Sequence, residues 1–129
     1  MPIQVVQLGT PRKGGEGLRI GTVRRPPRGV FKKDYAKLNY YDVWLPELAP
    51  NEAIMKDFRS GPFTEARWKQ FAHRYRSEMS IPEKSRMLDV LAALSRQTDF
   101  SVGCYCEDEE HCHRSILKKL LQEHGAQIV

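Results

Sequence analysis

The chain has 129 residues, of which 40% are hydrophobic and 29% are charged, and its formal net charge is +5 at pH 7. This length predicts one domain, residues 1–129, with its own hydrophobic core, and the composition is that of a globular protein in water. No apolar run reaches the roughly 18 residues that a membrane span needs, and the N-terminus lacks the pattern of a secretion signal. We therefore expect a cytoplasmic protein without membrane contact.

Three short strands are predicted in the first part of the chain. Strand-like runs occupy residues 3–8 and 18–23, and the first of them stops at a cluster of glycine, threonine and proline. The glycine-rich segment 14–17 between them lacks the spacing of a phosphate-binding loop. A third run, residues 40–45, carries aromatic and branched side chains and stops at Pro46.

Three helices are expected in the middle of the chain. Asn51 is a suitable N-cap for a short helix, and Thr64 for a longer one. The longer helix has the clearest amphipathic pattern of the sequence, with apolar residues at 68, 71, 72, 75 and 79. Ser80 and Glu83 have the spacing of a capping box, which predicts a third helix that extends to about Arg96.

A last strand and a last helix follow. Residues 100–106 alternate like a strand, and four apolar residues at helical spacing predict a helix that ends at Gly125. Residues 127–129 predict a final edge strand. Strands near both ends with helices between them indicate an α/β fold: one compact domain with a small, mostly parallel sheet and helices packed on it.

The junction between this last strand and helix concentrates reactive side chains. It holds all three cysteines and, with the helix after it, three of the four histidines, next to the acidic run 107–110. Cys106 is expected to be the more exposed thiol and Cys104 the more packed one. Cys112 and His113 should lie near the helix start, where unpaired backbone N–H groups favour anions and thiolates. An odd number of cysteines argues against a disulfide framework.

The first hypothesis is a thiol-dependent enzyme that acts on a small anionic molecule, phosphorylated or nucleotide-like. A thiolate beside a histidine is a competent nucleophile, and guanidinium groups bind phosphate or carboxylate at two points. The catalytic candidates are Cys106, Cys112, His113 and Glu107, and the anion-binding candidates are Arg114, Arg24, Arg25 and Arg28. The alternative without function is that the thiols are packed as small apolar groups and that His113 lies on the surface.

Two other kinds of function remain open. A zinc site could use Cys104, Cys106, His111 and Cys112, although zinc ligands usually come from better separated pairs. A nucleic-acid-binding module could use the basic segment 12–37, which contains nine Lys or Arg residues and only two acidic ones. Tyr35, Tyr40 and Tyr41 near this segment could stack on bases, but no known binding motif accompanies them.

Five segments together resemble the bacterial and archaeal family called domain of unknown function 488 (YeaO-like). They are residues 19–29, 44–50 and 68–75, the pair Cys106–Glu107 and the triplet Cys112–His113–Arg114. The resemblance covers nearly the whole chain and implies a compact α/β fold, without implying an activity. Residues 22–29 depart from the usual family sequence, whereas the cysteine motif resembles that of members with a plausible active site.

Overall fold

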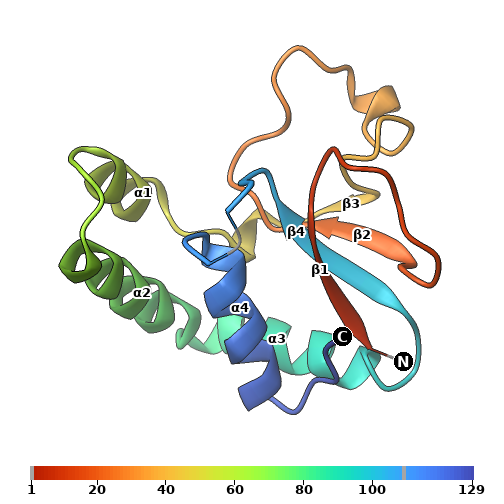
Figure 1. Ribbon diagram of the computed structural model, residues 1–129. Helices are drawn as coiled ribbons and strands as arrows, with labels where there is room; N and C mark the ends of the chain where they lie inside the picture. Colours follow the sequence, from red (N-terminus) through yellow and green to blue (C-terminus); the bar gives the residue numbers. More distant parts are fainter. Residues whose placement is uncertain (1, 109) are drawn as a thin grey trace.

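Four parallel strands form the sheet in this computed structural model, which describes residues 2–108 and 110–129 (Figure 1). They are β1 (Ile3–Gln7), β2 (Leu18–Gly21), β3 (Val43–Trp44) and β4 (Phe100–Cys104), in the order β1-β4-β2-β3. β4 pairs with both β1 and β2, and Val102 lies opposite Val5 on one side and Ile20 on the other. The predicted α/β fold with a parallel sheet is confirmed. Glu109, in the predicted acidic run, lies outside the described residues.

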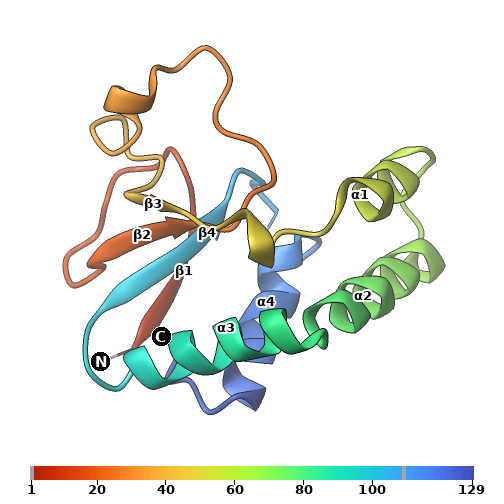
Figure 2. The ribbon, with the colours of Figure 1, turned by 180° about the vertical axis from the view of Figure 1, so that it is seen from behind.

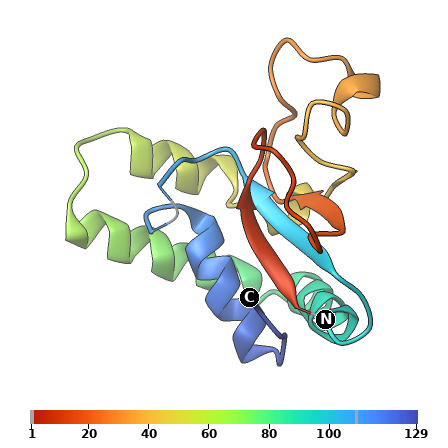
Figure 3. The same ribbon diagram turned by 45° about the vertical axis from the view of Figure 1, so that its right-hand side comes forward.

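Four helices complete the fold: α1 (Glu52–Arg59), α2 (Glu65–Met79), α3 (Pro82–Leu94) and α4 (His113–Glu123). Figure 2 shows α3 following directly after α2, and Figure 3 shows α2 and α4 on one side of the sheet and the loop of residues 22–42 on the other. All four helices contribute buried side chains to one core with β1 and β4. This burial of apolar surface holds the helices against the sheet.

The N-terminal caps of α1 and α2 agree with the sequence. The Asn51 side chain accepts a hydrogen bond from the Ile54 backbone N–H at 2.9 Å, and Thr64 accepts one from Arg67 at 3.1 Å. Each bond satisfies one of the N–H groups that a helix start leaves unpaired. The cap of α1 matters for the site, because this helix lines the cavity described below.

The predicted capping box at Ser80 is wrong. Helix α3 begins at Pro82 with Ile81 as N-cap, and the Ser80 hydroxyl instead donates to the Ser77 carbonyl at 2.6 Å. Proline fits the first helical position because it has no N–H that would need a partner. Ser80 therefore ends α2 instead of beginning α3, and α3 itself stops at Leu94, short of Arg96.

Four predicted strands are shorter than expected. The strand predicted over residues 100–106 ends at Cys104, which leaves Cys106 on the loop that follows. The first two end at Gln7 and Gly21, and the third keeps only Val43–Trp44. Tyr41 lies outside the third strand, and its ring packs directly against the backbone of Gly21, where an added Cβ would approach the ring to 2.4 Å. The predicted edge strand at 127–129 is reduced to one parallel bridge between Ile128 and Ile3, so that the two ends of the chain meet.

A buried ion pair lies under the long loops. Glu16 and Arg19 are 2% and 1% exposed and are bound to each other. Arg19 also donates to the carbonyls of Thr10 at 2.8 Å and Asn39 at 2.6 Å, while Ser101 donates to Glu16 at 3.1 Å. These bonds tie both loops to β2 and β4 and satisfy charges that would otherwise be costly to bury.

None of the helices described, residues 2–108 and 110–129, combines the length and the apolar character that crossing a membrane requires.

Candidate active site

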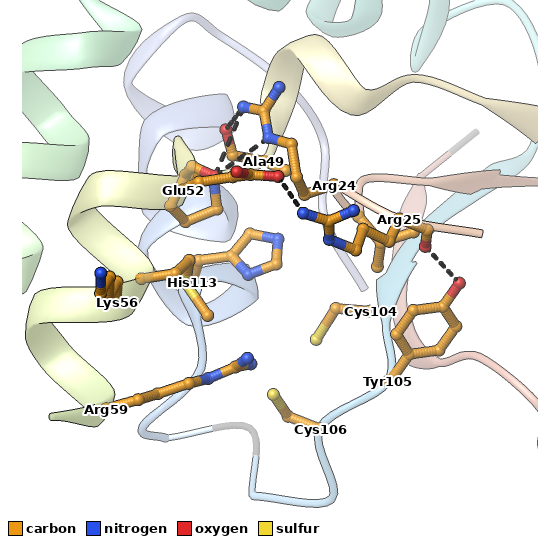
Figure 4. A pocket seen from close by; sticks show the side chains of 13 residues that line it. Arg24, Arg25, Ala49, Glu52, Lys56, Arg59, Cys104, Tyr105, Cys106 and His113 are labelled. Atoms are coloured by element: carbon orange, nitrogen blue, oxygen red, sulfur yellow. Dashed lines mark hydrogen bonds and ion pairs between the residues drawn. The ribbon is translucent and has the colours of Figure 1, made fainter. Parts of the chain in front are cut away.

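A cavity of about 400 Å³ opens at the carboxyl edge of the sheet (Figure 4). Strand β4 ends there at Cys104, and the segment that follows β2 runs beside it. Helix α1 forms the facing wall. In parallel sheets this edge is the usual place for a ligand, because strand ends and helix starts converge there. The lining residues are Val23, Arg24, Arg25, Ala49, Pro50, Glu52, Met55, Lys56, Arg59, Cys104, Tyr105, Cys106 and His113.

The three cysteine sulfur atoms gather at one side of this cavity. The sulfurs of Cys104, Cys106 and Cys112 all lie within 4.8 Å of one another. Cys104 and Cys112 are 1% and 3% exposed, whereas Cys106, which lies beyond the end of β4, is only half-buried; the expectation that Cys106 is more exposed than Cys104 is confirmed. Figure 4 shows the Cys104 and Cys106 side chains pointing into the cavity, so that Cys106 is the thiol that a ligand meets first.

His113 is held in one tautomer. Its Nε2 lies 2.7 Å from the Thr22 carbonyl oxygen, and because that oxygen only accepts hydrogen bonds, Nε2 carries the proton. The other ring nitrogen, Nδ1, then has a free lone pair and lies 3.7 Å from the Cys112 sulfur. Burial lowers the pKa of His113 to about 4, so the ring is neutral at physiological pH, and its Nδ1 is available to take a proton from the Cys112 thiol.

The cluster favours a single negative charge on Cys106. Hydrogen bonds from Cys104 and from Cys112, together with the positive charge of Arg59, lower the pKa of the Cys106 thiol. The pKa values of the other two thiols are raised, because their protons are held in bonds to neighbouring sulfurs and because both groups are buried. Two neutral thiols thus stabilise one thiolate, as in other charge-assisted hydrogen bonds.

Cationic side chains line the rest of the cavity. Arg24 is fixed to the Ala49 carbonyl at 3.0 Å, and Arg25 pairs with Glu52. Lys56 and Arg59 project from α1, and within the described chain no carboxylate pairs with either of them. In Figure 4 the Arg59 guanidinium extends toward the cysteine side of the cavity. The cavity therefore has a net positive charge beside the Cys106 sulfur.

Lys56 and Arg59 were not identified by sequence reasoning. The helix that carries them was predicted from Ile54, Met55 and Phe58, and its polar residues were left without a role. Their spacing of three residues, with Met55 beside them, places both on one flank of the helix. This spacing was the only indication in the sequence that the two cations act together. It does not reveal a site by itself, because the sequence does not show which strand end the helix faces.

Several predicted site residues lie elsewhere. Glu107 and Arg28 are exposed and do not line the cavity. Arg114, in the first turn of α4, is 4% exposed and points back to the Glu107 carbonyl at 3.4 Å, so it does not line the cavity either. Cys112 lies behind the lining residues, next to Cys104. Cys106, His113, Arg24 and Arg25 are brought together as predicted.

The predicted zinc ligands are brought together only in part. Cys104, Cys106 and Cys112 form a group that could hold a metal ion. His111 is not in this group: its Nδ1 bonds to Asp108 at 2.9 Å, and its ring packs on Phe63. The histidine nearest the sulfurs is His113, through Nδ1.

Much of the basic N-terminal segment is occupied by internal contacts. Arg12 pairs with Asp42 at 2.9 Å, Arg19 is buried with Glu16, and Arg24 binds backbone carbonyls. These arginines are therefore not free to contact phosphates along a nucleic acid. The basic side chains that remain exposed, such as those of Arg28, Lys32 and Lys33, lie outside the cavity lining.

Comparisons with known proteins support the resemblance seen in the sequence. No curated protein and no solved structure matches the chain significantly. A family model described as the active DUF488-N3 subclade matches residues 3–125, which is nearly the whole chain. The chain therefore belongs to the DUF488 family.

Proposed function

We propose that this protein is a cytoplasmic thiol-dependent enzyme whose nucleophile is Cys106 and whose substrate is a small anionic molecule. One observation carries the proposal: a half-buried thiol with a lowered pKa faces a cavity lined by four cationic side chains and one carboxylate. A thiolate is the reactive form of cysteine, and perturbed thiols in clefts are typical of catalytic sites. The free thiols are consistent with a reducing compartment.

The cavity also limits the substrate. A volume of about 400 Å³ is within the range of small-molecule sites and accommodates a phosphorylated metabolite or a nucleotide-sized ligand. Lys56 and Arg59 would bind the anionic group, because no carboxylate of residues 2–108 or 110–129 pairs with them. Val23, Pro50 and Met55 supply apolar surface for the rest of the molecule. The Cys106 thiolate would then attack an electrophilic atom of the bound substrate, and the leaving group would depart with the bonding electrons.

Alkylation with two reagents of similar size tests this proposal. Iodoacetate is anionic and iodoacetamide is neutral, so a basic cavity should favour iodoacetate relative to its rate with a free thiol. We expect both reagents to modify Cys106 first, and Arg59→Gln to slow iodoacetate more than iodoacetamide. Arg28→Gln is the matched control, because Arg28 is exposed and outside the lining. Equal reactivity of all three cysteines, at the rate of a model thiol, would refute the proposal.

A metal site is the second candidate, and the sulfur cluster favours it. Three sulfurs within 4.8 Å need to approach one another only slightly to bind a zinc ion, and His113 Nδ1 is a suitable fourth ligand because its other nitrogen is already bound to a carbonyl. Metal analysis of protein purified without chelator tests this. Stoichiometric zinc that is lost in Cys104→Ser would support the site, and its absence from the wild type would reject it.

A further inference from the structure

We propose that the cysteine cluster is a dithiol–disulfide centre, in which Cys106 attacks an anionic low-molecular-weight disulfide and Cys112 resolves the mixed disulfide that forms. This inference rests on the proposed function, because it uses Cys106 as the nucleophile. It adds a substrate class and a second catalytic thiol. The observation behind it is that the reactive thiol has two further thiols within 4.8 Å, one of them next to a base.

The positions of the thiols fit these two roles. Cys106 lies on the loop after β4 and is half-buried at the cavity, where an incoming disulfide would meet it. Cys112 is buried behind it as the N-cap of α4. Both therefore lie outside the hydrogen-bonded ladder of the sheet. Their sulfurs lie within 4.8 Å of each other, and the proposal requires them to close to a bond of about 2 Å.

His113 distinguishes Cys112 from Cys104 as the resolving thiol. A buried neutral thiol needs a base at the moment it attacks, and His113 Nδ1 lies 3.7 Å from the Cys112 sulfur with its lone pair free. The Arg114 backbone N–H at the start of α4 also bonds to this sulfur and would stabilise its thiolate. Cys104 is fixed in β4 opposite Gln7, and no base contacts it among the hydrogen bonds of the described residues.

The proposed reaction consists of two successive thiol–disulfide exchanges. The Cys106 thiolate attacks one sulfur of the disulfide RSSR, which forms Cys106–S–SR and releases one thiolate RS⁻. Cys112 then transfers its proton to His113 Nδ1 and attacks the Cys106 sulfur, which forms the Cys106–Cys112 disulfide and releases the second RS⁻. The proton on His113 passes to this leaving thiolate. The small disulfide is reduced by two electrons, the protein is oxidised by two, and a cellular thiol would return the protein to its dithiol form.

The charge of the cavity selects among disulfides. Arg59 and Lys56 have no carboxylate partner in the described part of the chain, so a disulfide that carries carboxylates should bind and react faster than a cationic one. Oxidised glutathione is a suitable anionic probe, and cystamine is a cationic one. We expect oxidised glutathione to react about tenfold faster or more relative to each reagent's rate with a free thiol.

Intact-mass measurement of the reduced full chain, with a chelator present, tests the inference. With oxidised glutathione, wild type should pass through a transient adduct to an adduct-free product that has lost two hydrogens. Cys112→Ser should accumulate the adduct on Cys106, and Cys106→Ser should not react. Cys104→Ser should still end at the adduct-free Cys106–Cys112 disulfide, whatever its rate of adduct formation, because Cys104 supports the Cys106 thiolate but does not resolve the adduct. His113→Gln should slow loss of the adduct without slowing its formation.

Three outcomes would overturn the inference. They are a permanent adduct in the wild type, a product disulfide that contains Cys104 in place of Cys112, and a faster reaction with cystamine than with oxidised glutathione. Its failure can be told apart from failure of the proposed function. If Cys106 is alkylated rapidly and with preference for iodoacetate, but no protein disulfide forms, the nucleophile stands and only the redox role is rejected.

Discussion

Burial of His113 makes the stability of the protein depend on pH, and His113→Gln should remove this contribution. The His113 ring is 6% exposed and its pKa is lowered to about 4 from 6.5, mainly by burial. In the unfolded chain this histidine therefore binds a proton near pH 6.5, whereas in the folded chain it binds one only near pH 4. Stability that is fully present above the unfolded pKa is lost as the pH falls through this window.

The size of the effect follows from these two pKa values. A proton that only the unfolded state binds lowers the free energy of unfolding by about 1.4 kcal/mol for each unit by which the pH falls within this window. Between about pH 7 and about pH 5 the decrease amounts to about 2 kcal/mol. Glutamine can replace the donor at Nε2 and keep the bond to the Thr22 carbonyl, but it does not titrate. When the pH is lowered over this interval, the free energy of unfolding of the variant should therefore fall by about 2 kcal/mol less than that of the wild type.

Urea unfolding at both pH values gives the comparison directly. The Cys106 thiolate also makes stability rise with pH, because its folded pKa is lowered, but it is present in both proteins. His73, His111 and His124 are also unchanged between the two proteins. The difference between the two proteins isolates His113. An equal loss of stability in wild type and variant would show that His113 is protonated in the folded protein, and would refute its role as a neutral acceptor beside Cys112.

Two further predictions concern the fold that positions the site. Glu16→Gln should lower the free energy of unfolding by about 3–5 kcal/mol, because it leaves Arg19 buried without its counter-charge. Asp57→Asn, which breaks an exposed pair with Arg74, should cost about 1 kcal/mol or less, and equal losses in chemical denaturation would contradict this account of the ion pair. Gly21→Ala should cost about 1–3 kcal/mol, because the new Cβ would meet the Tyr41 ring. Gly14→Ala, with open space around it, should change the midpoint of thermal unfolding little, and a similar shift in both variants would argue against this packing.

Local patterns predicted much of the fold and the position of the site. The caps at Asn51 and Thr64, the amphipathic pattern of α2 and the strand-turn-helix around Cys106 depend on neighbours a few residues away, and they were predicted correctly. The capping box at Ser80 failed although it is also local, because Pro82 competes for the helix start and Ser80 already ends α2.

The details of the site depend on contacts between distant segments. The sequence spacing of the three cysteines argued against convergence, yet the sulfur of Cys112 lies within 4.8 Å of those of Cys104 and Cys106. The tautomer of His113 is set by the carbonyl of Thr22, 91 residues away. Arg59 enters the cavity because α1 faces the end of β4. No pattern within any one of these segments specifies such pairings.

The pH dependence of Cys106 alkylation by iodoacetamide tests the central claim most directly, with the modified cysteine identified by peptide mass mapping. If Cys106 is a thiolate stabilised by its neighbours, its rate constant should stay nearly constant from about pH 8 down to about pH 5, while Cys104 and Cys112 remain unreactive. A rate that falls about tenfold per pH unit below a midpoint of about 8.5 is the behaviour of an ordinary thiol, and it would contradict the claim.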